Sequence, residues 1–191
     1  MVHLAPQHGA LREECPECAT PIGEVHMEGC DVSRCLVTGR QELSCHGLDH
    51  NHDEDNVDRW TGLWPGDAEC IAWGWYAKFE PGLGWRPTTA DDPQGAPDLN
   101  RLAVCKWDPG KRAHIRPTVK VHLEGAYVDG HEYERDIELP EPGLPDEDFW
   151  NEVFDHTGDA HFGPSGESID SYEEATVIGG RFDGESYSWG G

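Results

Sequence analysis

The sequence predicts an α+β fold in which a small N-terminal zinc knuckle precedes a tryptophan-rich middle region and a C-terminal ββαβ unit. Three observations predict this arrangement. Five of the seven cysteines lie between Cys15 and Cys45, and six of the eight tryptophans lie between Trp60 and Trp107. Beyond residue 116, apolar and polar residues alternate as they do in half-buried strands. We expect three regions: residues 1–46 as the zinc-knuckle module, 47–111 as the middle region and 112–191 as an acidic α+β unit.

The composition indicates a thin hydrophobic core and a strongly negative surface. The 191 residues include 38 Asp and Glu against 14 Lys and Arg, a formal charge of −24, and only 36% are hydrophobic. A conventional nucleic-acid-binding protein needs a basic face, so we expect no direct contact with nucleic acid and, instead, a protein partner with a basic surface. No stretch has the roughly 18 apolar residues of a membrane span, and no signal peptide is recognisable. We therefore expect a soluble cytoplasmic protein without membrane contact.

The N-terminal cysteines are spaced like metal ligands. Seven cysteines without a secretory signal indicate metal binding rather than disulfide bonds. The run Cys15-Pro16-Glu17-Cys18 is a zinc knuckle, in which two thiolates share one tight turn and Pro16 restricts the backbone in advance. Zn²⁺ takes four nitrogen or sulfur ligands at tetrahedral corners, so two more ligands are needed.

Two ligand sets complete this predicted site. One is a Cys₃His set, and the other is a Cys₄ set in which a later cysteine replaces the histidine. Gly29 favours the histidine, because it allows the turn that brings the Cys30 thiolate back toward His26, three positions before the glycine. Such a site contributes on the order of 10 to 16 kcal/mol, which is comparable to the stability of a whole domain. The two sets are Cys15, Cys18, His26 and Cys30, or Cys15, Cys18, Cys30 and Cys35.

The segment from Cys15 to Cys35 resembles a zinc-knuckle segment of uncharacterised proteins from actinobacteria and their phages. The resemblance is carried by Cys15-Pro16-Glu17-Cys18, by Ile22-Gly23-Glu24-Val25-His26 and by Gly29-Cys30-Asp31-Val32-Ser33-Arg34-Cys35, and it extends to about Trp107. In the fuller form, a second Cys-Pro-x-Cys-Gly knuckle stands where this chain reads Cys35-Leu36-Val37-Thr38-Gly39. The resemblance therefore implies that a second site has decayed, with Cys35 and Cys45 as its remnants. It implies no activity.

An acidic loop is predicted at residues 47–58, because this stretch has no apolar periodicity. Histidine-rich tracts bind transition metals, but a solvated loop must lose its conformational entropy to do so, and a plain solvated loop is the favoured interpretation. The residues that offer a second, weaker metal site here are His46, His50 and His52, with Asp49, Asp53 and Asp55 beside them.

The middle region is predicted to contain two short helices and a strand. We expect a helix from Asp67, as its N-cap, to a stop at Gly74, a strand over 75–79 and a second helix over 98–105. Clustered tryptophans can bind cations or bases. In a chain with few aliphatic residues, they more often supply the missing core volume, which is the role we expect here.

The C-terminal region is predicted to form a ββαβ unit. Alternation predicts strands over 118–124 and 132–139, with a hairpin turn at Asp129-Gly130, and a last strand over 171–178. Between them, three acids at 146–148 favour a helix N-terminus. We expect this helix to bury Phe149, Val153 and Phe154 and to end at Gly158.

No residue is assigned a catalytic role, and the expected cofactor is zinc alone. The chain has no nucleophile elbow, phosphate loop or dinucleotide fingerprint, and Cys70 and Cys105 are expected to be core thiols. The favoured hypothesis is a zinc-stabilised module that binds a protein partner without catalysis. One alternative is an acidic DNA mimic, with the acids of 141–191 along one ridge. Another is a metal-dependent hydrolase that uses the histidines of 46–52, or Asp155, His156, Asp159 and His161.

Overall fold

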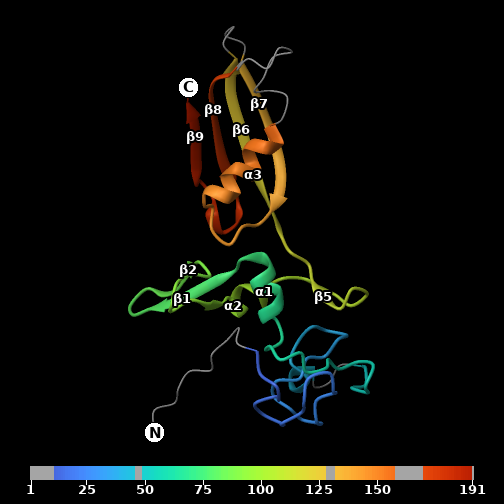
Figure 1. Cartoon of the computed structure of the whole chain (residues 1–191). Helices are drawn as coiled ribbons and strands as arrows, with labels where there is room; N and C mark the ends of the chain where they lie inside the picture. Colours follow the sequence, from blue (N-terminus) through green and yellow to red (C-terminus); the bar gives the residue numbers. More distant parts are fainter. Residues whose placement is uncertain (1–10, 46–48, 128–131, 158–169, 191) are drawn as a thin grey trace. The chain divides into compact units, whose positions relative to one another are not determined.

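The computed structural model describes residues 11–45, 49–127, 132–157 and 170–190 (Figure 1). It confirms a mixed α+β protein with three α-helices and several antiparallel sheets among these residues. The chain divides into two compact units, Met1–Arg116 and Pro117–Gly191, and each is described by itself. The division into three regions with boundaries near residues 46 and 111 stays a prediction.

The cysteine-rich start of the first unit has little regular secondary structure. Within the described part, residues 11–64 form one 3-10 helix, η1 (Glu42–Cys45), and four isolated β-bridges. Their buried cluster is small: Cys15, Cys30 and Val32 pack with Trp60, which is only 1% exposed. Two of these four residues are cysteines, so apolar packing alone leaves this segment with a thin core.

Helix α1 (Asp67–Trp73) begins one position earlier than expected, so the prediction of Asp67 as N-cap is wrong. Gly66 is the N-cap, with a φ of 99°, and Asp67 is the fully buried first helical residue. A Cβ at position 66 would lie 2.6 Å from the Leu102 side chain, so packing as well as backbone conformation requires glycine there. The helix ends at Gly74 as predicted.

A three-stranded sheet of order β2-β1-β3 follows α1. Its strands are β1 (Tyr76–Glu80), β2 (Gly84–Thr88) and β3 (Ala96–Pro97). Helix α2 (Leu99–Leu102) is shorter than the predicted 98–105, and the Asp98 carboxylate caps it by accepting from the Arg101 amide at 3.1 Å. Strands β4 (Trp107–Asp108) and β5 (Ala113–His114) then pair with each other.

The tryptophans of this unit divide between core and surface. Trp60 and Trp75 are buried, and the Arg101 guanidinium lies 3.8 Å from the Trp75 ring centroid. Trp85 is 51% exposed and meets Phe79 edge to face. Trp60 and Trp75 therefore supply core volume that aliphatic residues would otherwise provide, whereas Trp85 lies at the surface.

Glu69 on α1 connects two distant parts of the first unit. Its Oε2 accepts from Arg34 Nη1 at 2.9 Å, and its Oε1 accepts from the His114 amide at 2.8 Å. Burial alone would raise the pKa of this carboxyl group, but the hydrogen bonds from His114 and the charge of Arg34 outweigh it and lower the pKa to about 2.

We expect Glu69→Gln to destabilise the protein at neutral pH by about 1 to 2 kcal/mol, a figure reduced for solvent screening at this partly exposed group. Because the folded-state pKa lies below the unfolded value, the carboxylate stabilises the fold above about pH 4.5 and loses this effect as the pH falls toward 2. Urea unfolding of both proteins at pH 7 and pH 3 measures the difference, which should narrow at pH 3. The exposed Glu185→Gln is the control, and an equal gap at both pH values would contradict the prediction.

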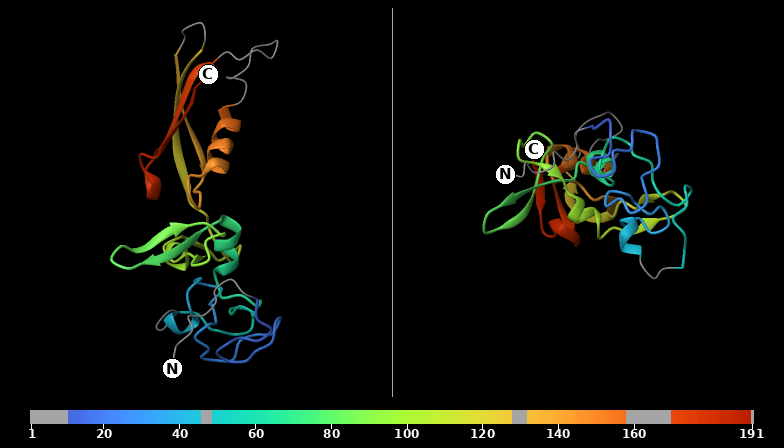
Figure 2. Two further views of the ribbon diagram at one scale, coloured as in Figure 1. Left: turned by 60° about the vertical axis from the view of Figure 1, so that its left-hand side comes forward. Right: turned by 90° about the horizontal axis from the view of Figure 1, so that it is seen from below.

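The second unit is a four-stranded antiparallel sheet of order β7-β6-β8-β9, with α3 (Glu147–Thr157) across one face (Figures 1 and 2). Its strands are β6 (Thr118–Tyr127), β7 (Glu132–Pro140), β8 (Asp170–Ile178) and β9 (Ser186–Gly190), with the 3-10 helix η3 (Gly180–Phe182) before β9. The expected turn at Asp129-Gly130 and the expected stop at Gly158 lie outside the described residues. Strand β9 is not among the predicted elements, although Ser186-Tyr187-Ser188-Trp189 alternates polar and aromatic residues.

The core of the second unit lies between α3 and the sheet. Val121, Leu123 and Val153 are fully buried, and the helix adds Phe149 and Trp150. Phe154, which was predicted to be buried, is only half-buried. Trp150, three positions before Val153 and so on the same side of the helix, is buried in this core and stacks on Tyr187.

The other face of this sheet carries acidic side chains. The strand register places every second residue of β7 on the face opposite α3, where these residues are exposed. Lys120 and His122 of β6 share this face, and both contact Asp136. The pKa of His122 is raised by its hydrogen bond to Asp136. The acids of this face, which we call the acidic sheet face, are Glu124, Glu132, Glu134, Asp136, Glu138 and Glu174.

Among the described residues, no helix has both the length and the apolar character needed to cross a membrane.

Candidate metal centres

Two groups of cysteine and histidine side chains in the first unit bring four ligand atoms close together. In each group the four atoms lie within 4.8 Å of one another, and both groups can hold a metal ion such as zinc. The first consists of Cys15, Cys18, His26 and Cys30, and the second of Cys35, Cys45, His50 and His52.

The spacing of the first group matches the edges of a zinc tetrahedron. With Zn–S bonds of about 2.3 Å and Zn–N bonds of about 2.05 Å, two sulfurs lie about 3.8 Å apart, and a sulfur and a nitrogen about 3.5 Å apart. The Cys15 and Cys30 sulfurs are 3.8 Å apart, far beyond the roughly 2.05 Å of a disulfide. His26 Nδ1 lies 3.5 Å from Cys18 Sγ and 3.4 Å from Cys30 Sγ.

Backbone hydrogen bonds shape the turn that carries the first two thiols. The Cys15 amide donates to the Thr20 carbonyl at 2.8 Å, and the Ala19 amide donates back to the Cys15 carbonyl at 2.9 Å. Ala19 has a φ of 57°, a left-handed conformation that closes the turn. The Thr20 hydroxyl also lies 3.2 Å from Cys18 Sγ. The knuckle therefore forms from local sequence, as the Cys-Pro-Glu-Cys run predicts.

The thiols of the first group have different proton affinities. Burial alone would raise the pKa of Cys18, but hydrogen bonds from Thr20, from the Met27 backbone and from His26 lower it to about 5. Burial raises the pKa of Cys30 to about 12, and the neighbouring Cys18 and Cys15 add to this. A thiolate at Cys18 is therefore available to a metal at neutral pH.

A carboxylate lies behind the histidine of the first group. His26 is buried, and its Nε2 lies 3.9 Å from Asp58 Oδ1, while its Nδ1 faces the thiols. Asp58 is held in place because the same oxygen accepts from the Arg34 amide at 2.8 Å. Burial raises the pKa of Asp58. Carboxylates that orient the second nitrogen of a histidine ligand are a usual part of metal sites, and a metal on Nδ1 would leave the proton on Nε2, facing Asp58.

The second group contains Cys35, which the alternative Cys₄ set had assigned to the first group. Cys35 Sγ lies 3.1 Å from His50 Nε2, which lies 3.2 Å from His52 Nε2. Both cysteines are buried and both histidines are half-buried. The structure thus brings the Cys₃His set together and places Cys35 with a different group. Which residues bind metal is a proposal, developed below.

The predicted histidine-rich site is rearranged in the structure. His50 and His52 meet Cys35 and Cys45, and the described acids Asp49, Asp53 and Asp55 do not belong to the group. His46 lies outside the described residues. The spacing Cys-x₉-Cys-x₄-His-x-His is present in the sequence, but Cys35 lies outside the predicted histidine-rich loop, so the loop pattern alone does not predict the combination. Cys35 and Cys45 lie in one ligand group with His50 and His52. The decay of a second site, which the resemblance implies, stays a prediction.

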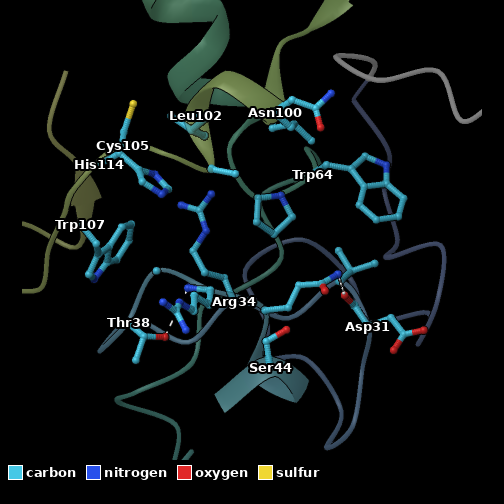
Figure 3. A pocket seen from close by; sticks show the side chains of 17 residues that line it. Asp31, Arg34, Thr38, Ser44, Trp64, Asn100, Leu102, Cys105, Trp107 and His114 are labelled. Atoms are coloured by element: carbon cyan, nitrogen blue, oxygen red, sulfur yellow. Dashed lines mark hydrogen bonds between the residues drawn. The ribbon is translucent and has the colours of Figure 1, made fainter. Parts of the chain in front are cut away.

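Two hollows lie near these groups within the first unit. One, of about 720 Å³, is lined by the cysteine-rich segment together with α2, β4 and β5, and Figure 3 shows Arg34 between Trp64 and Trp107 in it. The other, of about 790 Å³, is lined by His26 and His52 and by acids that include Glu42. One histidine of each ligand group therefore borders the acidic hollow.

The other residues singled out in the sequence are untested at 156–161 and described at Cys70. The His156 side chain, Asp159 and His161 lie outside the described residues. Cys70 is fully buried in α1, where burial and the nearby charge of Asp67 raise its pKa to about 12, as expected for a core thiol.

Comparisons of the chain with protein-family models, with curated proteins and with solved structures gave no match. The resemblance to actinobacterial and phage proteins stays a prediction.

Proposed function

We propose that this protein is a zinc-stabilised module without catalytic function that binds the basic surface of a protein partner. Zinc at Cys15, Cys18, His26 and Cys30 holds the first unit together, and the acidic sheet face of the second unit meets the partner. The observation that carries the proposal is the ligand set: four protein donor atoms lie within 4.8 Å of one another, which is enough to supply all four ligands that a structural zinc ion takes.

A closed set supports a structural role for the metal. Catalytic zinc sites keep one position open for water or substrate, whereas structural sites are filled by four protein ligands. The Asp58 carboxylate lies 3.9 Å from His26 Nε2, on the side away from the thiols, so it is placed to orient the histidine and not to bind the metal itself. This arrangement supports stabilisation over the hydrolase alternative.

The acidic sheet face supports a partner with a basic surface. Its six carboxylates are accompanied by one lysine, Lys120, and by His122. Such a concentration of like charge speeds association with oppositely charged surfaces. The described acids of residues 141–191 are distributed over the segment between β7 and α3, over α3 and β8, and over the segment before β9. That distribution supports a protein partner more than a DNA mimic with a single ridge in this region.

The proposal is tested by capturing partners from the native host with the wild-type protein and with a triple variant of the acidic sheet face. We expect Glu134→Gln, Asp136→Asn and Glu138→Gln together to reduce recovery of a basic protein at least tenfold. High salt should reduce the wild-type recovery in the same way, because exposed charges are screened.

The control triple variant, Glu147→Gln, Asp148→Asn and Glu152→Gln, changes the charge equally, at exposed positions on α3 in the same unit. It should retain the partner. Equal recovery by both triple variants, or recovery of nucleic acid alone, would refute the proposed mode of binding.

A further inference from the structure

The chain contains a second turn with the same backbone hydrogen bonds as the knuckle at Cys15, twenty residues later. In each turn, the amide of the first cysteine donates to the carbonyl five residues later, and the amide four residues later donates back to that cysteine. The N···O distances are 2.8 and 2.9 Å around Cys15, and 2.8 and 2.8 Å around Cys35. The isolated bridges Glu14↔Pro21 and Arg34↔Gln41 flank the two turns at the same offset.

The backbone dihedrals agree with this correspondence. The residue four positions after each cysteine has positive φ: 57° at Ala19 and 74° at Gly39. Glycine is required at the second turn for another reason, because a Cβ there would overlap the Trp107 ring. Trp107 also donates to the Leu36 carbonyl at 3.0 Å, so the second turn is fixed against β4.

The second turn lacks the second thiol of the first. Thr38 occupies the position that corresponds to Cys18, and its hydroxyl lies 3.1 Å from Cys45 Sγ. Ligand atoms arrive from elsewhere: Cys45 from the end of η1, and His50 and His52 from the following loop. Burial raises the pKa of Cys45, and the hydrogen bond from Thr38 only partly offsets this rise.

We infer that Cys35, Cys45, His50 and His52 form a second zinc site, of Cys₂His₂ type, with Thr38 supporting it as a hydrogen-bond donor. The His50 Nε2 to His52 Nε2 distance of 3.2 Å is close to the roughly 3.3 Å edge expected for two nitrogens on one zinc ion. The Cys35 to His50 distance of 3.1 Å is shorter than the roughly 3.5 Å edge expected for a sulfur and a nitrogen.

A second carboxylate supports this assignment independently. Glu42 Oε1 lies 3.9 Å from His52 Nδ1, the nitrogen that faces away from the ligand group; the His52 side chain is 25% exposed and the Glu42 side chain 11%. The first group has the same arrangement and the same distance between Asp58 and His26. In each group, one imidazole has one nitrogen within the ligand group and the other nitrogen 3.9 Å from a carboxylate, which is beyond direct hydrogen-bond distance but on the side where carboxylates orient histidine ligands.

Metal content measures the inference directly. The full-length protein, purified with zinc and passed through a desalting column, should contain two zinc ions per chain by elemental analysis. Cys45→Ser and His50→Ala should each reduce the content to one. The matched controls Cys105→Ser and His122→Ala lie outside both groups and should retain two. One ion per wild-type chain, or two ions in Cys45→Ser, would overturn the inference.

The correspondence between the two turns allows an experiment in which a second substitution restores zinc binding. Because Thr38 stands where the first knuckle has a ligand, adding Thr38→Cys to His50→Ala should restore the second ion. A double variant that stays at one ion would overturn the equivalence of the turns.

Cobalt titration of the wild-type protein avoids any dependence on variants that fold poorly. Two equivalents should be needed to saturate the thiolate-to-cobalt absorption, and saturation at one equivalent would overturn the inference. Cys18→Ser removes a ligand of the first group alone, so it should lose the first ion and retain the second. Failure to lose the first ion would count against the proposed function, whereas failure of the wild-type protein to bind a second ion would count against this inference.

Discussion

Cys18→Ser is expected to remove one zinc ion per chain and to unfold the part of the cysteine-rich segment that carries the first ligand group, while the second group keeps its fold. The thiol is one of four ligand atoms that lie within 4.8 Å of one another, and a structural zinc site contributes on the order of 10 to 16 kcal/mol. The apolar cluster around Trp60 is too small to replace that energy. Elemental analysis gives the zinc content, and hydrogen exchange reports protection of the Cys15, Ala19 and Cys30 amides, which should be lost.

Cys105→Ser provides the matched control for this experiment. It also removes one thiol from the first unit, but from a residue outside both ligand groups. It should keep both the zinc content and the amide protection of the wild type. Full zinc content in Cys18→Ser would contradict the assignment of the first group.

Leu123→Ala is expected to destabilise the second unit by about 2 to 5 kcal/mol, which is a large part of a typical domain's stability. Leu123 is completely buried in the centre of β6, so the substitution leaves a cavity between the sheet and α3. The zinc content should not change, because the ligand groups belong to the first unit. Denaturant unfolding followed by hydrogen exchange in β6 and β8 measures the effect.

Ile178→Ala is the control for the second unit. Ile178 ends β8 and is 45% exposed, so losing its side chain should cost less than about 1 kcal/mol. A cost below about 1 kcal/mol for Leu123→Ala as well, or zinc loss in that variant, would contradict the division of the chain into two separately stabilised units.

Features that depend on a few neighbouring residues were predictable from the sequence. The Cys15 knuckle, the stop of α1 at Gly74 and the alternation that marks β6 are all local signals. The structure describes a helix where acids at 146–148 favoured one, and it buries Phe149 and Val153 as expected.

Features that depend on long-range contacts were harder to predict. Cys35 meets His50 because the loop returns to β-bridges such as Cys35↔Val57, and no local pattern encodes that return. Loop length hardly separates alternative ligand sets, because closure entropy grows slowly with length. Likewise, Gly66 is the N-cap of α1 because it packs against Leu102, a residue thirty-six positions away.

The position of β7 at the edge of its sheet has a consequence for self-association. An edge strand exposes unpaired backbone groups to which a second copy of the chain can add, a route to aggregation. If two β7 strands paired edge to edge, the carboxylates of Glu134 and Asp136 would approach those of the other copy, and like charges across a strand pair are unfavourable. The acidic residues along this edge thus protect a small, thinly packed protein from forming extended sheets with itself.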